Sequence, residues 1–341
     1  MKQTKAKYLL TLAAICLAAV CGVTAYYFLT PFSSHKQTCY LYIDDDDTVD
    51  SVFLKLDTIG CQHGVTALHM IMRHTGYADR IHTGRYAIKP EDNSIKVFRQ
   101  LRSGRQQPLM LTIPESRTMD RLAASLSKRL MLDSAEVAQA LTDSTFTARY
   151  GYDTATVACL FIPNTYEVYW DLGLEPLMER MVKEHDAFWK GQRTAKAQAL
   201  GLTPDEVCTL ASIVDEETAN TAEKPMVAGM YLNRLAKSMP LQADPTVKFA
   251  LKQFGLRRIY NAMLRTDSPW NTYRYAGLPP GPIKIASVKG IDAVLNRADH
   301  DYLYMCAKED FSGTHNFATT YSEHLKNAAK YSKALNERGI K

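Results

Sequence analysis

Three consecutive carboxylates stand in the stretch "ASIVDEETAN", and their type and spacing suit acid–base chemistry. They are Asp215, Glu216 and Glu217. A carboxyl group that is held away from water keeps its proton to a higher pH, because desolvation disfavours the charged form, and it can then act as a general acid. The phase of the surrounding helix indicates which of the three is placed in this way.

The helix that carries the stretch has a well-marked beginning. Thr203 is a favourable N-cap, Pro204 suits the first turn, and Glu206 completes a capping box. With about 100° per residue, Glu217 falls in the middle of the apolar stripe, whereas Glu216 lies about 100° and Asp215 about 160° from its centre.

We therefore expect Glu217 to enter a cleft as a proton donor. Asp215 and Glu216 are expected to face water or the flank of the helix, so that Asp215→Asn remains largely active. The alternative is a helix that has frayed by residue 217, with Glu217 capping the next turn at Thr218, Asn220 or Thr221. Helical phase alone does not separate the two interpretations.

The segments that follow are dense in side chains that bind polysaccharides. Amides and carboxylates suit hydroxyl groups, and aromatic faces suit sugar rings. The candidates are Asn233, Gln242, Asp244, Trp270, Asn271, Tyr273 and Tyr275. Taken singly, Asp244 also fits a helix-initiating turn and Trp270 a core anchor, but their clustering after Glu217 favours a sugar-binding groove.

The composition of the chain limits the number of domains and the classes of ligand it can have. The chain has 341 residues, 46% of them hydrophobic and 23% charged, which is enough for two domains. The formal charge of +5 gives no indication of nucleic-acid binding. Seven scattered cysteines form neither a disulfide framework nor a CxxC metal site, and one bridge among them stays optional.

Residues 8–30 form an apolar stretch long enough to cross a membrane. Lys2, Lys5 and Lys7 precede it, so the positive-inside rule leaves residues 1–7 in the cytoplasm and exports the rest. A cleavable signal peptide ending at Ala25 and a lipid anchor are the alternatives to an uncleaved transmembrane anchor.

The remainder is predicted to be an α+β protein. A polar tether at 31–38 precedes a small module of two strands and two helices at 39–105, of a kind that commonly binds wall sugars. Strands run into helices capped by Thr48, Ser94 and Thr118, and the four aspartates 44–47 fit a solvated turn better than a cation site. Residues 106–341 are expected to form a mixed α/β catalytic domain, with a helical core and a loop-rich C-terminal third.

Five ordered motifs carry a specific resemblance. "LASIVDEETA", "NRL", "LQADPTV", "WNTY" and "GLPPGPI", within residues 210–283, resemble the endolytic murein transglycosylase family, also called YceG-like. The resemblance implies a bacterial inner-membrane protein with one transmembrane helix, a LysM-like βααβ module and a periplasmic domain that cuts glycan strands internally. Asp215 and Ser116 depart from the residues usual in the family, as do the neighbours of His315.

The resemblance also implies a reaction. Glu217 would protonate the oxygen between N-acetylmuramic acid and N-acetylglucosamine, then accept the proton of the muramic C6 hydroxyl, giving a 1,6-anhydro end without metal or cofactor. The substrate-binding residues would be Asn233, Gln242, Asp244, Thr246, Asn271, Tyr273 and His315. The expected partners are peptidoglycan strands, the membrane and peptidoglycan synthases, and the expected role is to terminate strand growth. A non-catalytic wall-binding protein and a hydrolytic muramidase are the alternatives.

Overall fold

The structure is a computed structural model that describes residues 2–256 and 258–339, and it divides into two compact units. The N-terminal unit comprises residues 1–111, 129–131 and 167–172, and the C-terminal unit comprises residues 112–128, 132–166 and 173–341. The first unit therefore extends past residue 105, where the sequence placed the boundary, and includes two short segments from later in the chain.

The N-terminal apolar helix is present as α1 (Lys2–Leu29). Its segment Lys5–Leu29 has a mean hydropathy of 2.2 and is not buried by the rest of the protein. By length and composition α1 can cross a membrane, as predicted.

The elements after α1 form a small α/β module. They are β1 (Cys39–Ile43), α2 (Val49–Asp57), α3 (Gln62–His74), the 3₁₀ turn η1 (Tyr77–Asp79), β2 (Gly84–Ile88) and α4 (Ser94–Arg102). β1 and β2 pair antiparallel with Cys39 opposite Ile88. α2 and α3 lie between the two strands, and α4 follows β2, so the region has one α-helix more than the two that were predicted. Leu41 and Ile43 point into the core of the module, while Tyr42 between them is exposed.

Two local predictions for this region need correction. Phe32, expected in a polar tether, is fully buried in the core of the module, and its backbone N–H donates to the carbonyl oxygen of Asp92. The cap of α4 is Asn93, whose side chain accepts from the N–H of Lys96, and Ser94 is instead buried and donates to the carbonyl of Gly64. Asn and Ser are equally good caps, so sequence alone could not choose between adjacent positions.

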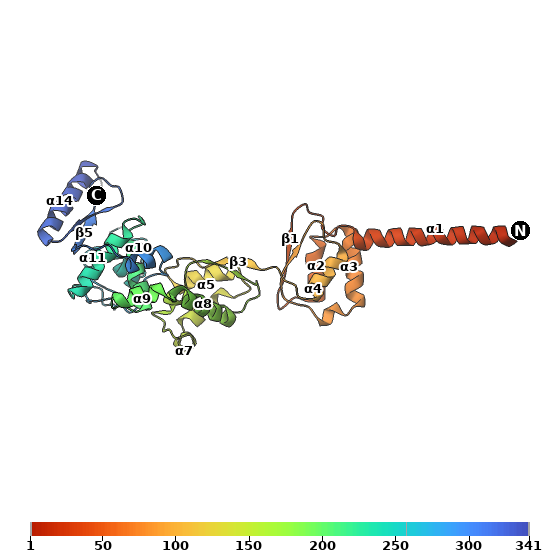
Figure 1. Cartoon of the computed structure of the whole chain (residues 1–341), viewed down its shortest axis with the longest axis horizontal. Coiled ribbons are helices and arrows are strands. Elements are labelled where there is room, and N and C mark those ends of the chain that lie inside the picture. Colours follow the sequence, from red (N-terminus) through yellow and green to blue (C-terminus); the bar gives the residue numbers. More distant parts are fainter. Residues whose placement is uncertain (1, 257, 340–341) are drawn as a thin grey trace. The chain divides into compact units, whose positions relative to one another are not determined.

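The C-terminal unit is mainly helical. Its helices are α5 (Met119–Ser127), α6 (Ser134–Thr142), α7 (Ser144–Ala148), η2 (Val157–Leu160), α8 (Leu174–Trp189), α9 (Gln192–Ala199), α10 (Pro204–Glu217), α11 (Lys224–Ala236), α12 (Asp244–Ala250), η3 (Met263–Arg265), α13 (Val288–Leu295) and α14 (Tyr321–Glu337). β3 (Leu109–Thr112) and β4 (Thr165–Val168) form one two-stranded sheet. β5 (Tyr304–Ala307) and β6 (His315–Ala318) form an antiparallel hairpin on which α14 packs (Figure 1).

α10 is the core helix of this unit. All eight residues from Val207 to Val214 are buried, and the six hydrophobic ones among them belong to one core cluster with residues of α11 and α13. A helix enclosed on every side has no water-facing stripe, so its polar residues must find partners inside the protein. Ser212 does so by accepting a hydrogen bond from the N–H of Ile283 at 3.0 Å, which anchors the "GLPPGPI" loop to the helix.

Candidate functional site

α10 begins and ends at the residues that the sequence predicts. The Thr203 side chain accepts from the N–H of Glu206, the Glu206 side chain accepts from the N–H of Thr203, and the helix continues to Glu217. The frayed alternative is therefore wrong, and Thr218 is the C-cap.

Glu217 has a single hydrogen-bond donor among the residues that the structure describes. The Tyr231 hydroxyl on α11 donates to Oε1 of Glu217 at 2.7 Å. Oε2 has no protein partner within residues 2–256 and 258–339 and is not a buried atom, so it faces open space. Glu217 thus presents one oxygen outward while the other is fixed.

The surroundings of Glu217 favour its protonated form. Burial raises the pKa of this carboxyl from 4.5 to about 7, and the nearby Asp244 adds to the rise. The Tyr231 hydrogen bond opposes the rise most strongly, and His315 and Lys248 oppose it as well. At neutral pH a large fraction of Glu217 therefore carries a proton that it can donate.

A cavity of about 240 Å³ opens at Glu217. Segments far apart in the sequence form its walls: α10 and α11, the loop leading into α12, the loop around Tyr273, and the β5–β6 hairpin. Its lining residues are Glu217, Met230, Tyr231, Arg234, Leu241, Gln242, Asp244, Tyr273, Met305, Cys306, Ala307 and His315.

Four of the seven predicted substrate-binding residues line this cavity. Gln242 has a left-handed backbone (φ 53°), which a non-glycine residue adopts at a cost, and its Oε1 accepts from Arg234 at 3.2 Å. The Tyr273 hydroxyl donates to Oδ1 of Asp244 at 2.6 Å. His315 completes the group from β6.

The other three lie behind the cavity and hold its backbone. Asn233 donates to the carbonyls of His300 and Tyr302, which secures the approach to β5. Thr246 is fully buried and donates to the carbonyl of Ala243. These side chains are engaged with the protein and do not line the cavity.

Asn271 belongs to the same group. It is fully buried, and its amide donates to the carbonyls of Leu264 and Thr266 while its Oδ1 accepts from the N–H of Tyr273. Asn271 therefore shapes the loop that presents Tyr273.

Sequence reasoning missed three residues of the site. Tyr231 fixes Glu217, and Arg234 donates to the carbonyls of Leu241 and Leu303, which joins two walls of the cavity. Glu223 binds His315 at the backbone and the ring. The tyrosine and the arginine within the largely apolar α11 were the available indication for the first two, because buried polar groups need specific partners.

The prediction for Asp215 is wrong. Its side chain is only 1% exposed, and it accepts from the N–H of Ser287 at 2.7 Å, from the Ser287 hydroxyl at 2.8 Å, and from Lys224. Ser287 is the N-cap of α13, and Gly290 leaves the room that Asp215 fills: a Cβ there would lie 2.5 Å from the carboxylate. The side of α10 opposite Glu217 is covered by α13, so the amphipathic assumption fails.

Two further predictions concern flanking residues. Glu216 lies on the flank, as expected, where Arg117 donates to its carboxylate at 2.8 Å. Trp270 is a core anchor: it packs on the core around α10, and its indole donates to the carbonyl of Gly281 at 3.2 Å. It lines a separate hollow of about 380 Å³ and not the cavity at Glu217.

The arrangement suits acid catalysis on a substrate rich in hydroxyl groups. It combines one proton-bearing carboxyl group with amide, carboxylate, phenol and imidazole groups that can bind hydroxyl and acetamido groups. The raised pKa of Glu217 places its working range at neutral pH.

Comparison with known proteins points the same way. A "YceG-like family" pattern matches residues 41–330. The chain is 28% identical to the endolytic murein transglycosylase of Bacillus subtilis, over 85% of this chain and 83% of that protein. It is 24% identical to the Streptococcus pneumoniae protein of the same name, over 88% of this chain and 59% of that one.

A solved structure agrees with these matches. The crystal structure of a YceG-like protein from Listeria monocytogenes superposes with a TM-score of 0.57 at 26% identity, covering 86% of this chain and 99% of that one. Because the family pattern spans most of the sequence and both units, the chain belongs to the YceG-like family.

Proposed function

We propose that this protein is a peptidoglycan lytic transglycosylase that cuts the bond between N-acetylmuramic acid and N-acetylglucosamine within glycan strands and leaves 1,6-anhydro ends. The observation that carries the proposal is Glu217, a carboxyl group with a pKa near neutrality at the wall of an open cavity. The names of the bacterial relatives supply the substrate class.

The acid step follows from the geometry of Glu217. Tyr231 fixes Oε1, so the outward Oε2 delivers the proton to the glycosidic oxygen as the bond to C1 breaks. The muramic C6 oxygen then closes on C1 and loses its proton. In the simplest scheme the Glu217 carboxylate takes that proton, and no water is consumed.

The predicted binding residues serve this step in two ways. Gln242, Asp244, Tyr273 and His315 would contact the sugar from the cavity wall. Asn233, Thr246 and Asn271 would act from behind by keeping the backbone of that wall in place. Substitutions in the first group should lower substrate affinity and rate. Substitutions in the second group should lower stability as well.

A hydrolytic muramidase is the second candidate, because Asp244 lines the same cavity as Glu217. Glycoside hydrolases use two carboxyl groups, one as the acid and the other as nucleophile or base. Here Tyr273 donates to Asp244, which restrains its carboxylate and makes it a better binding group than a free nucleophile.

The products decide among these functions. Purified peptidoglycan is incubated with the full chain in detergent, and the fragments are analysed by mass. We expect anhydro-muropeptides from within strands, and none with Glu217→Gln. Reducing ends would show a hydrolase, and the absence of fragments would show a binding protein.

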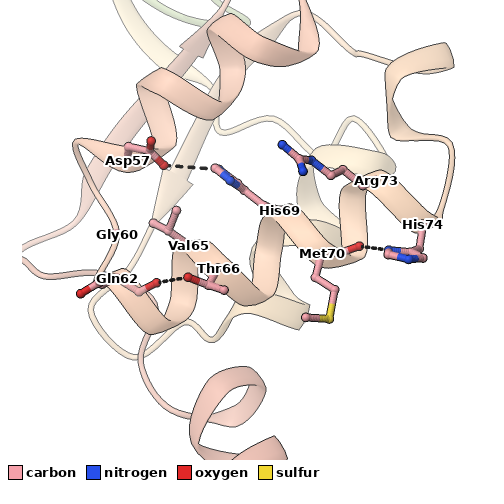
Figure 2. Close-up of a pocket in the computed structure, with 9 residues that line it drawn as sticks. All are labelled: Asp57, Gly60, Gln62, Val65, Thr66, His69, Met70, Arg73 and His74. Carbon is pink, nitrogen blue, oxygen red and sulfur yellow. Dashed lines mark hydrogen bonds and ion pairs between the residues drawn. The ribbon is translucent and has the colours of Figure 1, made fainter.

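We extend the proposal to the N-terminal unit as a LysM-like module that holds the wall. A groove of about 760 Å³ runs along α3, lined by polar groups beside the apolar Val65 and Met70. Figure 2 shows Asp57 pointing across the groove to His69, 3.3 Å from its Nε2, with Gln62 and Arg73 on the same helix face. In the Glu217→Gln background, Gln62→Ala and Arg73→Ala should weaken co-sedimentation with wall sacculi, and unchanged binding would refute this assignment.

The proposal places the protein in the bacterial inner membrane, with α1 as a single-pass anchor and the residues after α1 in the periplasm. The lysines before the apolar stretch support this orientation. There the enzyme would meet new strands beside the synthases and terminate their growth. Protease treatment of spheroplasts tests the orientation: the bulk of the chain should be digested without lysis.

A further inference from the structure

Glu223 and His315 form a pair at the edge of the cavity that the proposed chemistry does not yet use. Glu223 accepts the backbone N–H of His315 at 2.6 Å through Oε1, and Nδ1 of the ring lies 3.0 Å from Oε2. The Glu223 side chain is 8% exposed and that of His315 is 15% exposed. Two bonds from one carboxylate therefore fix both the position and the rotation of this imidazole.

This contact determines which ring nitrogen is available. A carboxylate only accepts hydrogen bonds, so Nδ1 carries the hydrogen that it donates to Glu223. Nε2 has no hydrogen-bond partner within residues 2–256 and 258–339, and it is not a buried atom. Since His315 lines the cavity and Glu223 does not, Nε2 is the ring atom that faces the space beside Glu217.

A carboxylate behind an imidazole is the arrangement by which enzymes orient a histidine as a proton acceptor. The hairpin that carries His315 is held in other ways as well: Arg234 donates to the carbonyl of Leu303, and Asn233 to that of Tyr302. Because these bonds already attach the hairpin, the largely buried Glu223–His315 pair is not needed for that purpose alone.

We propose that His315, oriented by Glu223, is the base of the reaction and takes up the proton of the muramic C6 hydroxyl. The proposal rests on the proposed function and replaces the second task that the simplest scheme gives to Glu217. Glu217 is then the acid only, His315 is a catalytic residue, and Glu223 is a positioning residue.

The step balances without water or a cofactor. The bond between C1 and the glycosidic oxygen breaks, and that oxygen takes the proton of Glu217. The C6 oxygen bonds to C1, and its proton goes to Nε2 of His315. Exchange with solvent then returns Glu217 and His315 to their starting forms.

The experiment measures the release of anhydro-muropeptides by the full chain in detergent, with and without added imidazole. A positioned base contributes on the order of 10²–10⁴ in rate, so His315→Ala should lose activity by that factor. Free imidazole should restore part of the rate in proportion to its concentration, and it should not accelerate the wild type or Glu217→Gln. Loss of kcat in Glu223→Gln with KM unchanged would support the positioning role, because the amide can donate to Nδ1 and favour the wrong tautomer.

Glu309→Gln is the matched control. Glu309 accepts from the side chain of Asn316, the residue next to His315 on β6, at 2.7 Å and does not line the cavity. It should keep the wild-type rate. If His315→Ala does not fold, His315→Gln takes its place in the rate measurement.

Wild-type kcat in a folded His315 variant would overturn the proposal, and so would a folded, inactive His315→Ala that imidazole does not rescue. Activity retained by Glu217→Gln would instead overturn the proposed function, whatever the His315 variants do. The two failures are therefore distinguishable.

Discussion

The last turn of α10 borders two regions that treat a carboxylate in opposite ways. On the side of α13, Asp215 is enclosed with three donors, one of them the cation of Lys224. On the side of the β5–β6 hairpin, the donor to Glu217 is the neutral hydroxyl of Tyr231, and the other carboxyl oxygen is open to a cavity. The partners of a buried acid, and not burial alone, decide whether it stabilises the fold or is available to donate a proton.

The largest expected effect is the loss of catalytic rate when Glu217 is replaced. Glu217→Gln keeps the acceptor for Tyr231 but has no proton to transfer, so activity should fall on the order of 10²–10⁴ or more. The release of anhydro-muropeptides and the thermal midpoint are measured together. If the variant loses both activity and folded structure, Glu217 stabilises the fold as Asp215 does.

Asp215→Ala changes the carboxylate on the α13 side, and its main effect should be on stability. It leaves Lys224 buried and unpaired, which costs about 3–5 kcal/mol in such pairs. Denaturant unfolding of this variant, of Lys224→Met and of the double variant forms a cycle, in which we expect the double variant to recover part of the loss. Additive losses in the cycle would show that the two side chains are not coupled.

A smaller effect should appear in the pH dependence of stability. The folded pKa of Glu217, about 7, exceeds its ordinary value of 4.5, so folding favours the protonated form. The wild type should therefore lose about 1–3 kcal/mol relative to Glu217→Gln as the pH rises from 4.5 to 7, and no more above that. A difference that stays constant over this range would contradict the raised pKa.

The smallest effect should come from Tyr231→Phe. The hydroxyl lowers the pKa of Glu217, so its removal should raise that pKa further and move the alkaline fall in activity to higher pH. One lost hydrogen bond costs about 1 kcal/mol of stability. A shift of the alkaline limb to lower pH in the rate profile would show that Tyr231 acts in another way.

The local parts of this site were accessible from the sequence. The Thr203 cap and the capping box fix where α10 begins, and an unbroken pattern carries it to Glu217. Gln242, Asp244, Tyr273 and His315 were singled out and do meet in one cavity. Short-range rules suffice for the helix because caps and helical phase depend on neighbouring residues. The cavity residues were singled out by their side-chain chemistry and by the family resemblance.

The parts that failed depend on contacts between distant segments. Asp215 was predicted to face water or the flank because a helix with one apolar stripe usually has a solvent-exposed side. In the structure α13 covers that side, and its N-cap Ser287 is 72 residues from Asp215 in the sequence. Glu223 meets His315 across 92 residues, and no local pattern encodes such a pair. Asn271 and Thr246 have side chains that could bind a sugar, but in the structure these side chains donate hydrogen bonds to backbone carbonyls.

The hairpin wall has a consequence for biosynthesis. The acid and its Tyr231 partner lie on α10 and α11, whereas β6 and His315 come later in the chain. A nascent or truncated chain therefore has its proton donor without a closed site. Activity should therefore appear only after the β5–β6 hairpin has docked and completed the cavity wall.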